Sequence, residues 1–297
     1  MYPARFNYHR PATLQDALRL LAQFEGEASV LAGGQSLIPM MKLRMGDFPE
    51  IVDIGRLPDL SYIEQRGDTV HIGALARHAQ IAGSEVAQQI PLLGDIAGGI
   101  ADRQVRTMGT IGGGIGIADP SGCWPCGLRT LRASVVCSGP NGNRTIAVDD
   151  LILGSYTTCL ETNEIITEIQ FPVLPAPSGG AYVAFKRSAA AYPTVAVGVA
   201  LELDGDTCSR VRIVLGGAAT TTVVSDEAEA VLAGKTVNET LLQQAGELIV
   251  ASSSPSPDAR GSEAFKRAML RSLVVEAGQR ALARARGEQI KGGHRYA

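Results

Sequence analysis

Two glycine-rich stretches constrain the fold of this 297-residue chain more than any other feature. LAGGQSLIPMMKLR covers residues 31–44 and RTMGTIGGGIGIADP covers residues 106–120, and each combines paired glycines with a short apolar strand and small polar residues. Glycines at a strand-to-helix turn let backbone N–H groups approach an oxygen-rich ligand, because no Cβ intervenes. The stretches are therefore either two tight turns or two loops that grip one anionic ligand, such as a diphosphate. The Thr and Ser beside the glycines add hydroxyl donors, which favours the second interpretation.

The first 174 residues predict a mixture of helices and strands. Thr13 followed by Asp16 resembles a capping box and predicts a helix that ends near Gly26. A helical pattern, broken at Pro91 and at the Gly98-Gly99 pair, fills residues 76–107. In the first glycine stretch, a strand at SVLA leads into Gly33-Gly34, and a helix is expected after them. Further strands are expected at EIVDIG and NEIITEIQFP, and hairpins at LSYIEQRGDTVHIGAL and ASVVCSGPNGNRTIAV.

The last third of the chain has a different texture. PVLPAPSGG, residues 172–180, is typical of a linker between domains. After it, three apolar runs with a turn at Asp204-Gly205 predict an antiparallel sheet. Helical patterns follow at about residues 226–252 and 262–286. The sequence therefore predicts an α+β chain, with a mixed N-terminal part and a C-terminal part of sheet and helices.

The composition narrows the classes of function. A hydrophobic fraction of 45% with 19% charged residues is typical of a folded globular chain, and a net charge of −3 gives no global attraction to nucleic acid. No apolar run approaches the length of a membrane span, and the N-terminus lacks the basic and apolar regions of a signal peptide. Five cysteines, an odd number, suit a reducing cytoplasm better than a disulfide framework. We therefore expect a cytoplasmic protein that binds neither nucleic acid nor membrane.

The chain carries no recognisable acid–base machinery of its own. GGGIGIAD has Ile117 where a dinucleotide-binding Gly-x-Gly-x-x-Gly motif needs glycine, and Glu229 replaces the first glycine of a P-loop. The four histidines, at 9, 71, 78 and 294, lack metal-ligand spacing, and the single Cys-x-x-Cys, at Cys123 and Cys126, supplies too few ligands for zinc or a cluster. We therefore expect no catalytic residues and no metal site, and chemistry that is done by a bound cofactor.

Several segments in the same order resemble a known family. LAGGQSLIPMMKLR, VRTMGTIGGGIGIADP, NEIITEIQFP and AFKRSAAAYPTVAVGVAL are together similar to the FAD-binding medium subunit of molybdenum hydroxylases, the family of aerobic carbon monoxide dehydrogenase and xanthine dehydrogenase. The resemblance implies a two-subdomain FAD-binding fold of the vanillyl-alcohol-oxidase/PCMH type. It places the first subdomain at residues 1–58 and the second at 59–174. An α/β C-terminal domain with an antiparallel sheet follows at 178–297.

The resemblance also implies which residues bind FAD. The first diphosphate loop is matched by one run of five residues and the second by another, and three further residues match contacts of the flavin. The complete set is Ala32, Gly33, Gly34, Gln35, Ser36, Thr110, Ile111, Gly112, Gly113, Gly114, Ile166, Lys186 and Tyr192. The Ile166 side chain matches an apolar residue that packs on FAD, whereas Lys186 and Tyr192 match residues beside the flavin ring. For these last two, exposed strand and turn positions are the alternative.

Two positions depart from the family pattern. The family usually has asparagine after TIGG, where this chain has Gly114, and it commonly has an acidic residue where this chain has Cys123. The second departure weakens a ribose or adenine contact at that point, which Asp119 is a candidate to replace. How either departure affects FAD binding is not fixed by the sequence.

Three functions remain open at this stage. The resemblance implies an electron-transfer subunit that takes electrons from the [2Fe-2S] clusters of a small subunit to FAD and on to an external acceptor. A large subunit would hold molybdopterin, and the complex would be a dimer of heterotrimers. The alternatives are a self-sufficient flavin oxidase or dehydrogenase that acts on a small substrate, and a non-redox nucleotide-binding or scaffold protein. The substrate of the complex and its electron acceptor are not determined by this chain.

Overall fold

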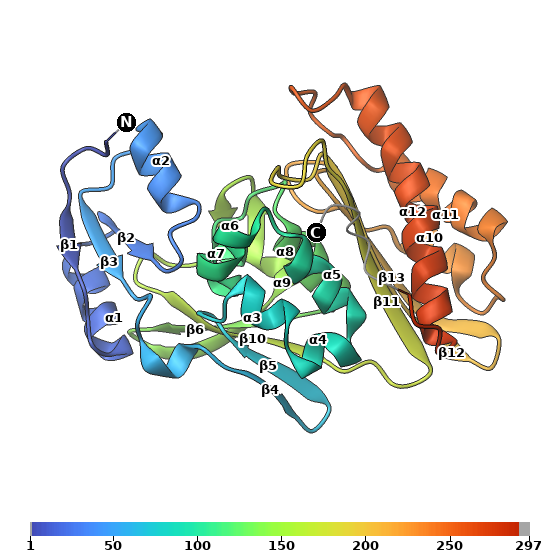
Figure 1. Cartoon of the computed structure of the whole chain (residues 1–297), viewed down its shortest axis with the longest axis horizontal. Coiled ribbons are helices and arrows are strands. Elements are labelled where there is room, and N and C mark those ends of the chain that lie inside the picture. The colour runs from blue at the N-terminus through green and yellow to red at the C-terminus, as the bar shows by residue number, and fades with distance from the viewer. Residues whose placement is uncertain (1, 291–297) are drawn as a thin grey trace.

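The computed structural model describes residues 2–290, and its N-terminal end forms a small α/β unit. A three-stranded parallel sheet has the order β1-β3-β2. Figure 1 shows this unit in blue at one end of the molecule. Its elements are β1 (Asn7–His9), α1 (Leu14–Gln23), β2 (Ala28–Leu31), α2 (Leu37–Leu43) and β3 (Glu50–Asp53).

The predicted helix after Thr13 is confirmed. The Thr13 hydroxyl oxygen accepts a hydrogen bond from the backbone N–H of Asp16 at 3.1 Å, which caps α1. Leu18 and Leu21 lie on its buried face and pack in one core with Val52 of β3. The helix ends at Gln23, slightly before the predicted end at Gly26.

The middle of the chain forms a five-stranded antiparallel sheet covered by short helices. The strand order is β4-β5-β10-β6-β7, and both predicted hairpins, β4–β5 and β6–β7, are confirmed. The strands are β4 (Ile63–Arg66), β5 (Thr69–Gly73), β6 (Ser134–Gly139), β7 (Gly142–Ala147) and β10 (Ile165–Pro172), with the small pair β8 (Ile152–Gly154) and β9 (Thr157–Thr158). The helices are η1 (Pro58–Leu60), α3 (His78–Ala82), α4 (Glu85–Gln89), α5 (Pro91–Gly99), α6 (Arg103–Met108), α7 (Ile111–Gly116), α8 (Cys123–Thr130) and α9 (Val148–Leu151).

The C-terminal part is a three-stranded antiparallel sheet with helices on one face. The strands pair in the order β11-β12-β13, as predicted. They are β11 (Ser178–Phe185), β12 (Val195–Asp204) and β13 (Thr207–Gly216), and the helices are α10 (Asp226–Leu232), α11 (Glu239–Ala251) and α12 (Glu263–Ala285). The prediction of one continuous helix over 226–252 is wrong. Gly234 adopts a φ of +72° after α10, and the Asn238 side chain caps α11 by accepting from Leu241 N–H at 3.0 Å.

The two larger units pack face to face in layers. In Figure 1 the helices α5 and α8 lie between the five-stranded sheet and β11–β13, while α10, α11 and α12 cover the outer face of the second sheet. Close approach of α8 to β12 requires Gly198, because a Cβ there would lie 2.1 Å from the Thr130 hydroxyl oxygen. Tyr182 and Val214 of the second sheet belong to the same core as Trp124 of α8. One hydrophobic core therefore spans both units.

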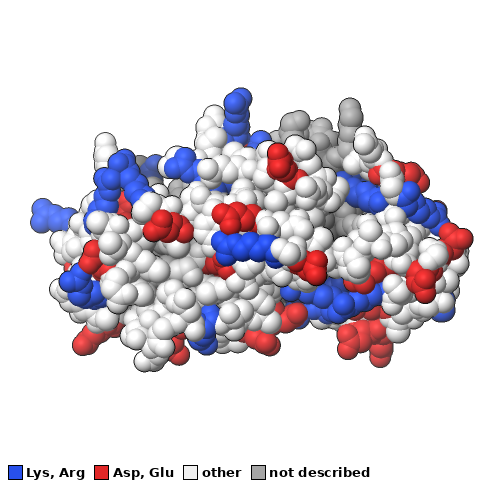
Figure 2. All heavy atoms as spheres, turned by 90° about the horizontal axis from the view of Figure 1, so that it is seen from below, with Lys and Arg blue, Asp and Glu red and all other residues white. Residues whose placement is uncertain are grey.

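The surface carries charges of both signs. On the face that Figure 2 shows, acidic and basic side chains of the described residues are interspersed rather than gathered by sign. Between residues 2 and 290, none of the helices has the length and apolar character needed to cross a membrane.

Candidate cofactor-binding site

The two glycine-rich stretches meet in space and line one cleft. Its cavity has a volume of about 300 Å³ and lies between the N-terminal unit and the five-stranded sheet. Residues of β10 complete the wall opposite the loops. Ten of the thirteen residues predicted to bind FAD line it: Ala32, Gly33, Gly34, Gln35, Ser36, Thr110, Gly112, Gly113, Gly114 and Ile166. The sequence therefore predicted a set of residues that the fold brings together.

The first loop, residues 32–36, presents unpaired backbone donors to this cleft. Gly34 has a φ of +71°, which favours glycine and turns the chain from β2 into α2. The backbone N–H groups of Gly33, Gly34, Gln35 and Ser36 donate to no acceptor within the described part of the chain. The carbonyl groups of the same loop are used instead by α2, because Gly34 O accepts from Ile38 N–H and Ser36 O accepts from Met40 N–H. These free donors suit an anion with several oxygens.

The second loop, residues 110–114, is arranged differently, because the backbone N–H groups of residues 111–114 are already used. The Thr110 hydroxyl oxygen caps α7, and the backbone N–H groups from Ile111 to Gly114 all have acceptors inside the chain. The four bonds are Ile111 to Ala76 O at 3.0 Å, Gly112 to Ala74 O at 2.9 Å, Gly113 to Thr110 Oγ1 at 3.2 Å and Gly114 to Thr110 O at 2.9 Å. This loop therefore offers the cleft open space and a hydroxyl group rather than a row of N–H donors.

Glycine is needed in both loops by close backbone contacts. A Cβ on Gly33 would lie 2.2 Å from the carbonyl oxygen of Met108, immediately before the second loop. A Cβ on Gly112 would lie 2.6 Å from the Cβ of Ala74 and 2.8 Å from its carbonyl oxygen. Real Cβ atoms do not tolerate such distances to backbone. The two loops are thus fitted against each other and against the end of β5.

Three predicted residues do not line the cavity. The Ile111 side chain is fully buried in the core behind the second loop. The Lys186 ammonium donates to the carbonyl oxygen of Gly99, and burial lowers the pKa of this lysine. Tyr192 is 49% exposed, and its side chain lies near that of Ser36 in the first loop. Burial and the nearby Asp119 raise the pKa of Tyr192. Tyr192 therefore lies beside the cleft, whereas Lys186 lies on the junction with the C-terminal unit.

Two titratable residues line the cleft that sequence reasoning did not select. Glu164 precedes β10 and forms an ion pair with Arg144 at 2.6 Å, and this arginine holds the pKa of the Glu164 carboxyl below its usual range. His78 begins α3 and is 5% exposed. His78 stands in ordinary local sequence, and Glu164 lies in the NEIITEIQFP segment, where only Ile166 was predicted to bind FAD.

Comparison with known proteins decides the family. The sequence matches the family model for the FAD binding domain in molybdopterin dehydrogenase over residues 4–174, and that for the CO dehydrogenase flavoprotein C-terminal domain over residues 180–281. The chain belongs to the FAD-binding medium subunits of the molybdenum hydroxylases. It is accordingly an FAD-binding subunit of an oxidoreductase, and the predicted α+β fold with a separate C-terminal domain is confirmed.

Individual members of the family show how far the similarity extends. The carbon monoxide dehydrogenase medium chain of Hydrogenophaga pseudoflava is 38% identical over 285 residues, which cover 96% of this chain and 99% of that one. The 6-hydroxypseudooxynicotine dehydrogenase complex subunit alpha of Paenarthrobacter nicotinovorans is 34% identical, with 96% and 97% covered. A solved structure of the Hydrogenophaga pseudoflava carbon monoxide dehydrogenase superposes with a TM-score of 0.93, at 40% identity, over 96% of this chain and 99% of its own.

The cleft of this medium subunit fits FAD on its own geometry. It combines unpaired backbone donors in the first loop, glycine surfaces without Cβ atoms in the second, and the apolar side chains of Ile165 and Ile166 on the facing strand. A diphosphate needs the donors, and the uncharged portions of a dinucleotide need the apolar wall. No group of three or more His, Cys, Asp or Glu residues within 2–290 is placed to hold a metal.

The two departures from the family pattern have different surroundings. Gly114 lines the cleft, and Trp124 stands directly behind it. Cys123 lies outside the cavity lining, is buried, and has a pKa raised by that burial, with Tyr182 and Lys186 as neighbours. Asp119, the candidate replacement, accepts from Ser121 N–H at 2.8 Å and does not line the cleft either.

Proposed function

We propose that this chain holds FAD in the cleft and acts as the electron-transfer subunit of a molybdenum hydroxylase. A small subunit with [2Fe-2S] clusters would supply electrons, a large subunit would hold molybdopterin, and the complex would assemble as a dimer of heterotrimers. The observation that carries the proposal is the first loop, whose free N–H donors face a cleft shaped by glycines. Bound FAD supplies the capacity to accept and release electrons singly or in pairs.

Each predicted residue has a role that its position supports. The N–H groups of residues 33–36 would bind the diphosphate, and the Thr110 hydroxyl would add a donor from the second loop. Gly112, Gly113 and Gly114 would let the cofactor lie close to the backbone, with Ile111 supporting them from behind. Ile166 would pack on FAD from β10. We assign Tyr192, which lies near Ser36, and Lys186, at the junction between units, to the flavin end.

Direct oxidation of a substrate by this chain alone is disfavoured by the two titratable residues of the cleft. A flavin dehydrogenase of that kind needs a base beside the substrate. Glu164 is a poor base, because Arg144 stabilises its carboxylate through two hydrogen bonds of 2.6 and 2.7 Å. The Nδ1 atom of His78 already accepts a hydrogen bond from Trp124 Nε1 at 3.2 Å, which places the imidazole proton on the nitrogen that faces the cleft. Neither group is free to accept a proton there.

We further propose the boundaries and location of the protein. Residues 1–58 and 59–174 would form the two FAD-binding subdomains, and 178–297 the C-terminal domain. Support comes from the separate sheets of these segments and from the short connection between β10 and β11. We propose a cytoplasmic location, which suits five cysteines that are all free thiols.

The test is FAD binding by glycine variants of the full chain. Gly33→Val and Gly112→Val should abolish binding, because their Cβ atoms would collide with Met108 O and Ala74. Gly154→Val is the matched control, since a Cβ on Gly154 has no neighbour within 4 Å. The visible absorption of reconstituted protein measures occupancy, and circular dichroism verifies that each variant is folded. Full flavin absorption in a folded Gly33→Val variant would contradict the proposed cleft.

A second measurement separates the two redox functions. The purified chain, loaded with FAD, is mixed anaerobically with candidate substrates, with and without the large and small subunits. Our proposal expects bleaching of the flavin only when those subunits are present. Bleaching by substrate with the isolated chain would favour the self-sufficient dehydrogenase, and a chain that cannot bind FAD at all would exclude both redox functions.

A further inference from the structure

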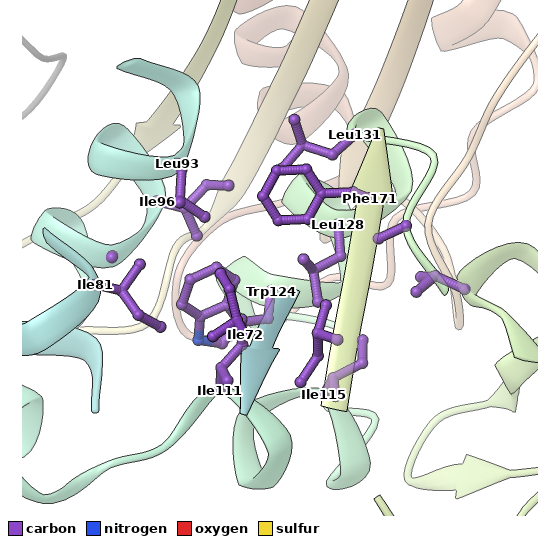
Figure 3. Close-up of a cluster of buried hydrophobic side chains, with 14 of the residues drawn as sticks. Ile72, Ile81, Leu93, Ile96, Ile111, Ile115, Trp124, Leu128, Leu131 and Phe171 are labelled. Atoms are coloured by element: carbon purple, nitrogen blue, oxygen red, sulfur yellow. The ribbon is translucent and has the colours of Figure 1, made fainter. Parts of the chain in front are cut away.

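Gly114 is fixed as glycine by one tryptophan. A Cβ at this position would lie 2.4 Å from Cδ1 and 3.2 Å from Nε1 of the Trp124 indole. Trp124 is 2% exposed and, as Figure 3 shows, sits among Ile72, Ile81 and Ile111 in the central core. The indole has no room to move away, so any side chain at 114 would collide with it. The side of the second loop that a longer residue would occupy is therefore filled by Trp124.

The same indole fixes the proton of His78. Trp124 Nε1 donates to His78 Nδ1 at 3.2 Å, and the two rings lie 5.8 Å apart with a tilt of 44°. An indole N–H only donates, so Nδ1 of the imidazole must be the accepting nitrogen. Burial lowers the pKa of His78 to about 4, and the ring is therefore neutral near pH 7. A neutral imidazole that accepts at Nδ1 carries its one proton at Nε2.

The Nε2–H group lies at the wall of the cleft without a partner. His78 lines the cavity, and Nε2 lies 2.7 Å from the place where a Cβ on Gly109 would stand. The backbone N–H of His78 donates to Gly109 O at 3.0 Å, which ties α3 to the second loop. Within residues 2–290, the hydrogen-bond network gives Nε2–H no acceptor. The residue as a whole is 5% exposed, but Nε2 is not among the fully buried unpaired atoms of residues 2–290, so a ligand oxygen in the cleft can reach its proton.

Neighbouring charges do not offer another partner. Arg106 is the charged residue that influences His78, and it lowers the pKa of this histidine further. The Arg106 guanidinium is engaged, since it donates to Ile100 O at 2.9 Å and to Ala101 O at 3.0 Å. A guanidinium carries only donors, so it cannot accept a hydrogen bond from Nε2–H. Because His78 lines the cleft, a ligand bound there can supply the acceptor.

We propose that His78, oriented by Trp124, is an FAD-binding residue whose Nε2–H donates a hydrogen bond to an oxygen of the dinucleotide backbone. The inference rests on the proposed function, because the oxygen belongs to FAD in the cleft. Trp124 is a positioning residue: it sets the tautomer of His78 and does not itself line the cavity. Gly114 is then required to make space for Trp124, which accounts for the missing asparagine of the family pattern.

Two amide substitutions separate the donor from the packing. His78→Gln keeps an amide N–H near the Nε2 position, whereas His78→Asn keeps an acceptor for Trp124 near Nδ1 but has no donor at the cleft. We expect His78→Asn to weaken FAD binding by the full-length apoprotein roughly 10- to 100-fold, and His78→Gln to restore affinity to within roughly threefold of the wild type. Affinity is measured by titration of flavin fluorescence, with circular dichroism as the test of folding.

A measurement on the unaltered side chain guards against misfolded variants. In protein labelled with ¹⁵N-histidine, the nitrogen shifts of His78 report the tautomer and its Nε2–H resonance reports the hydrogen bond. We expect the Nε2–H tautomer before FAD is added, a downfield shift of this proton when FAD binds, and a mixed tautomer in Trp124→Phe. An unshifted Nε2–H resonance, or equal FAD affinity in the wild type and His78→Asn, would overturn the inference while leaving the proposed function intact. A wild-type apoprotein that fails to bind FAD would overturn both.

Discussion

A buried ion pair fastens the C-terminal domain to the FAD-binding domain, and its removal provides a quantitative test of the packing. Arg284 of α12 binds Asp95 of α5 through two bonds, Nη1 to Oδ2 at 2.6 Å and Nη2 to Oδ1 at 3.0 Å. Their side chains are only 5% and 2% exposed. Nη1 of Arg284 also donates to Gly180 O at 2.7 Å, at the start of β11. The perturbation is Arg284→Met, which keeps most of the side-chain volume and removes the charge.

The expected loss follows from what the substitution leaves behind. The Asp95 carboxylate would stay buried without its guanidinium, with the Tyr182 N–H at 3.2 Å as a remaining donor. Breaking one side of a buried pair typically lowers the free energy of unfolding by about 3–5 kcal/mol. Replacing both residues, as Asp95→Leu with Arg284→Met, also removes the buried carboxylate and leaves the Tyr182 N–H and Gly180 O without these partners. Because each unpaired group costs roughly 1 kcal/mol or more, the double variant should be about 1–2 kcal/mol more stable than Arg284→Met alone.

Urea unfolding provides the assay. The chain has a single tryptophan, Trp124, whose fluorescence reports on the FAD-binding domain, while circular dichroism follows the whole chain. Comparison of the wild type, both single variants and the double variant gives the coupling energy of the pair. A loss below about 1 kcal/mol for Arg284→Met, or a double variant less stable than both single variants, would refute the reasoning that a buried carboxylate deprived of its guanidinium dominates.

Two further predictions concern the core behind the cleft. The pKa of His78 is about 4 in the folded chain and about 6.5 when unfolded, so the unfolded state binds more protons between these values. The contribution of neutral His78 to the free energy of unfolding is therefore fully present above pH 6.5. It should fall by about 2 kcal/mol by pH 5, and thermal or urea melts of His78→Asn should not show this loss. Gly114→Ala should destabilise the protein by about 1–3 kcal/mol through contact with Trp124; in a Trp124→Leu background the same change should be nearly neutral, and equal effects in both backgrounds would contradict the contact.

The features that sequence predicts well here are local. The cap at Thr13 and the hairpin turns at Gly67 and Gly205 depend on a few adjacent residues, and the structure contains all three. The prediction of one helix over 226–252 was wrong for a related reason. Its apolar period continued through Gly234 and Asn238, although these are themselves a C-terminal stop and an N-cap. Greater weight on those two residues would have divided the helix correctly.

The candidate site was predicted in composition but not in how its parts work. That the N–H groups of the second loop are already bonded depends on Ala74 and Ala76, which are distant in sequence and reach it through the fold. The place of His78 depends on Trp124, forty-six positions away. Such pairs have no local signature, because long-range packing alone brings them together. The sequence therefore identified the loops, and the fold assigned the donors.

The unequal use of backbone N–H groups in the two loops has a consequence for how the site fills. Most of the second loop is satisfied before any cofactor arrives, since the backbone N–H groups of residues 111–114 have acceptors in the chain itself. The backbone N–H groups of the first loop need acceptors from a ligand that carries several oxygens. A diphosphate can meet that requirement, so we expect ADP to compete with FAD for the first loop. Under the proposed function, the first loop would recognise the diphosphate, and discrimination in favour of the flavin would depend on residues farther along the cleft.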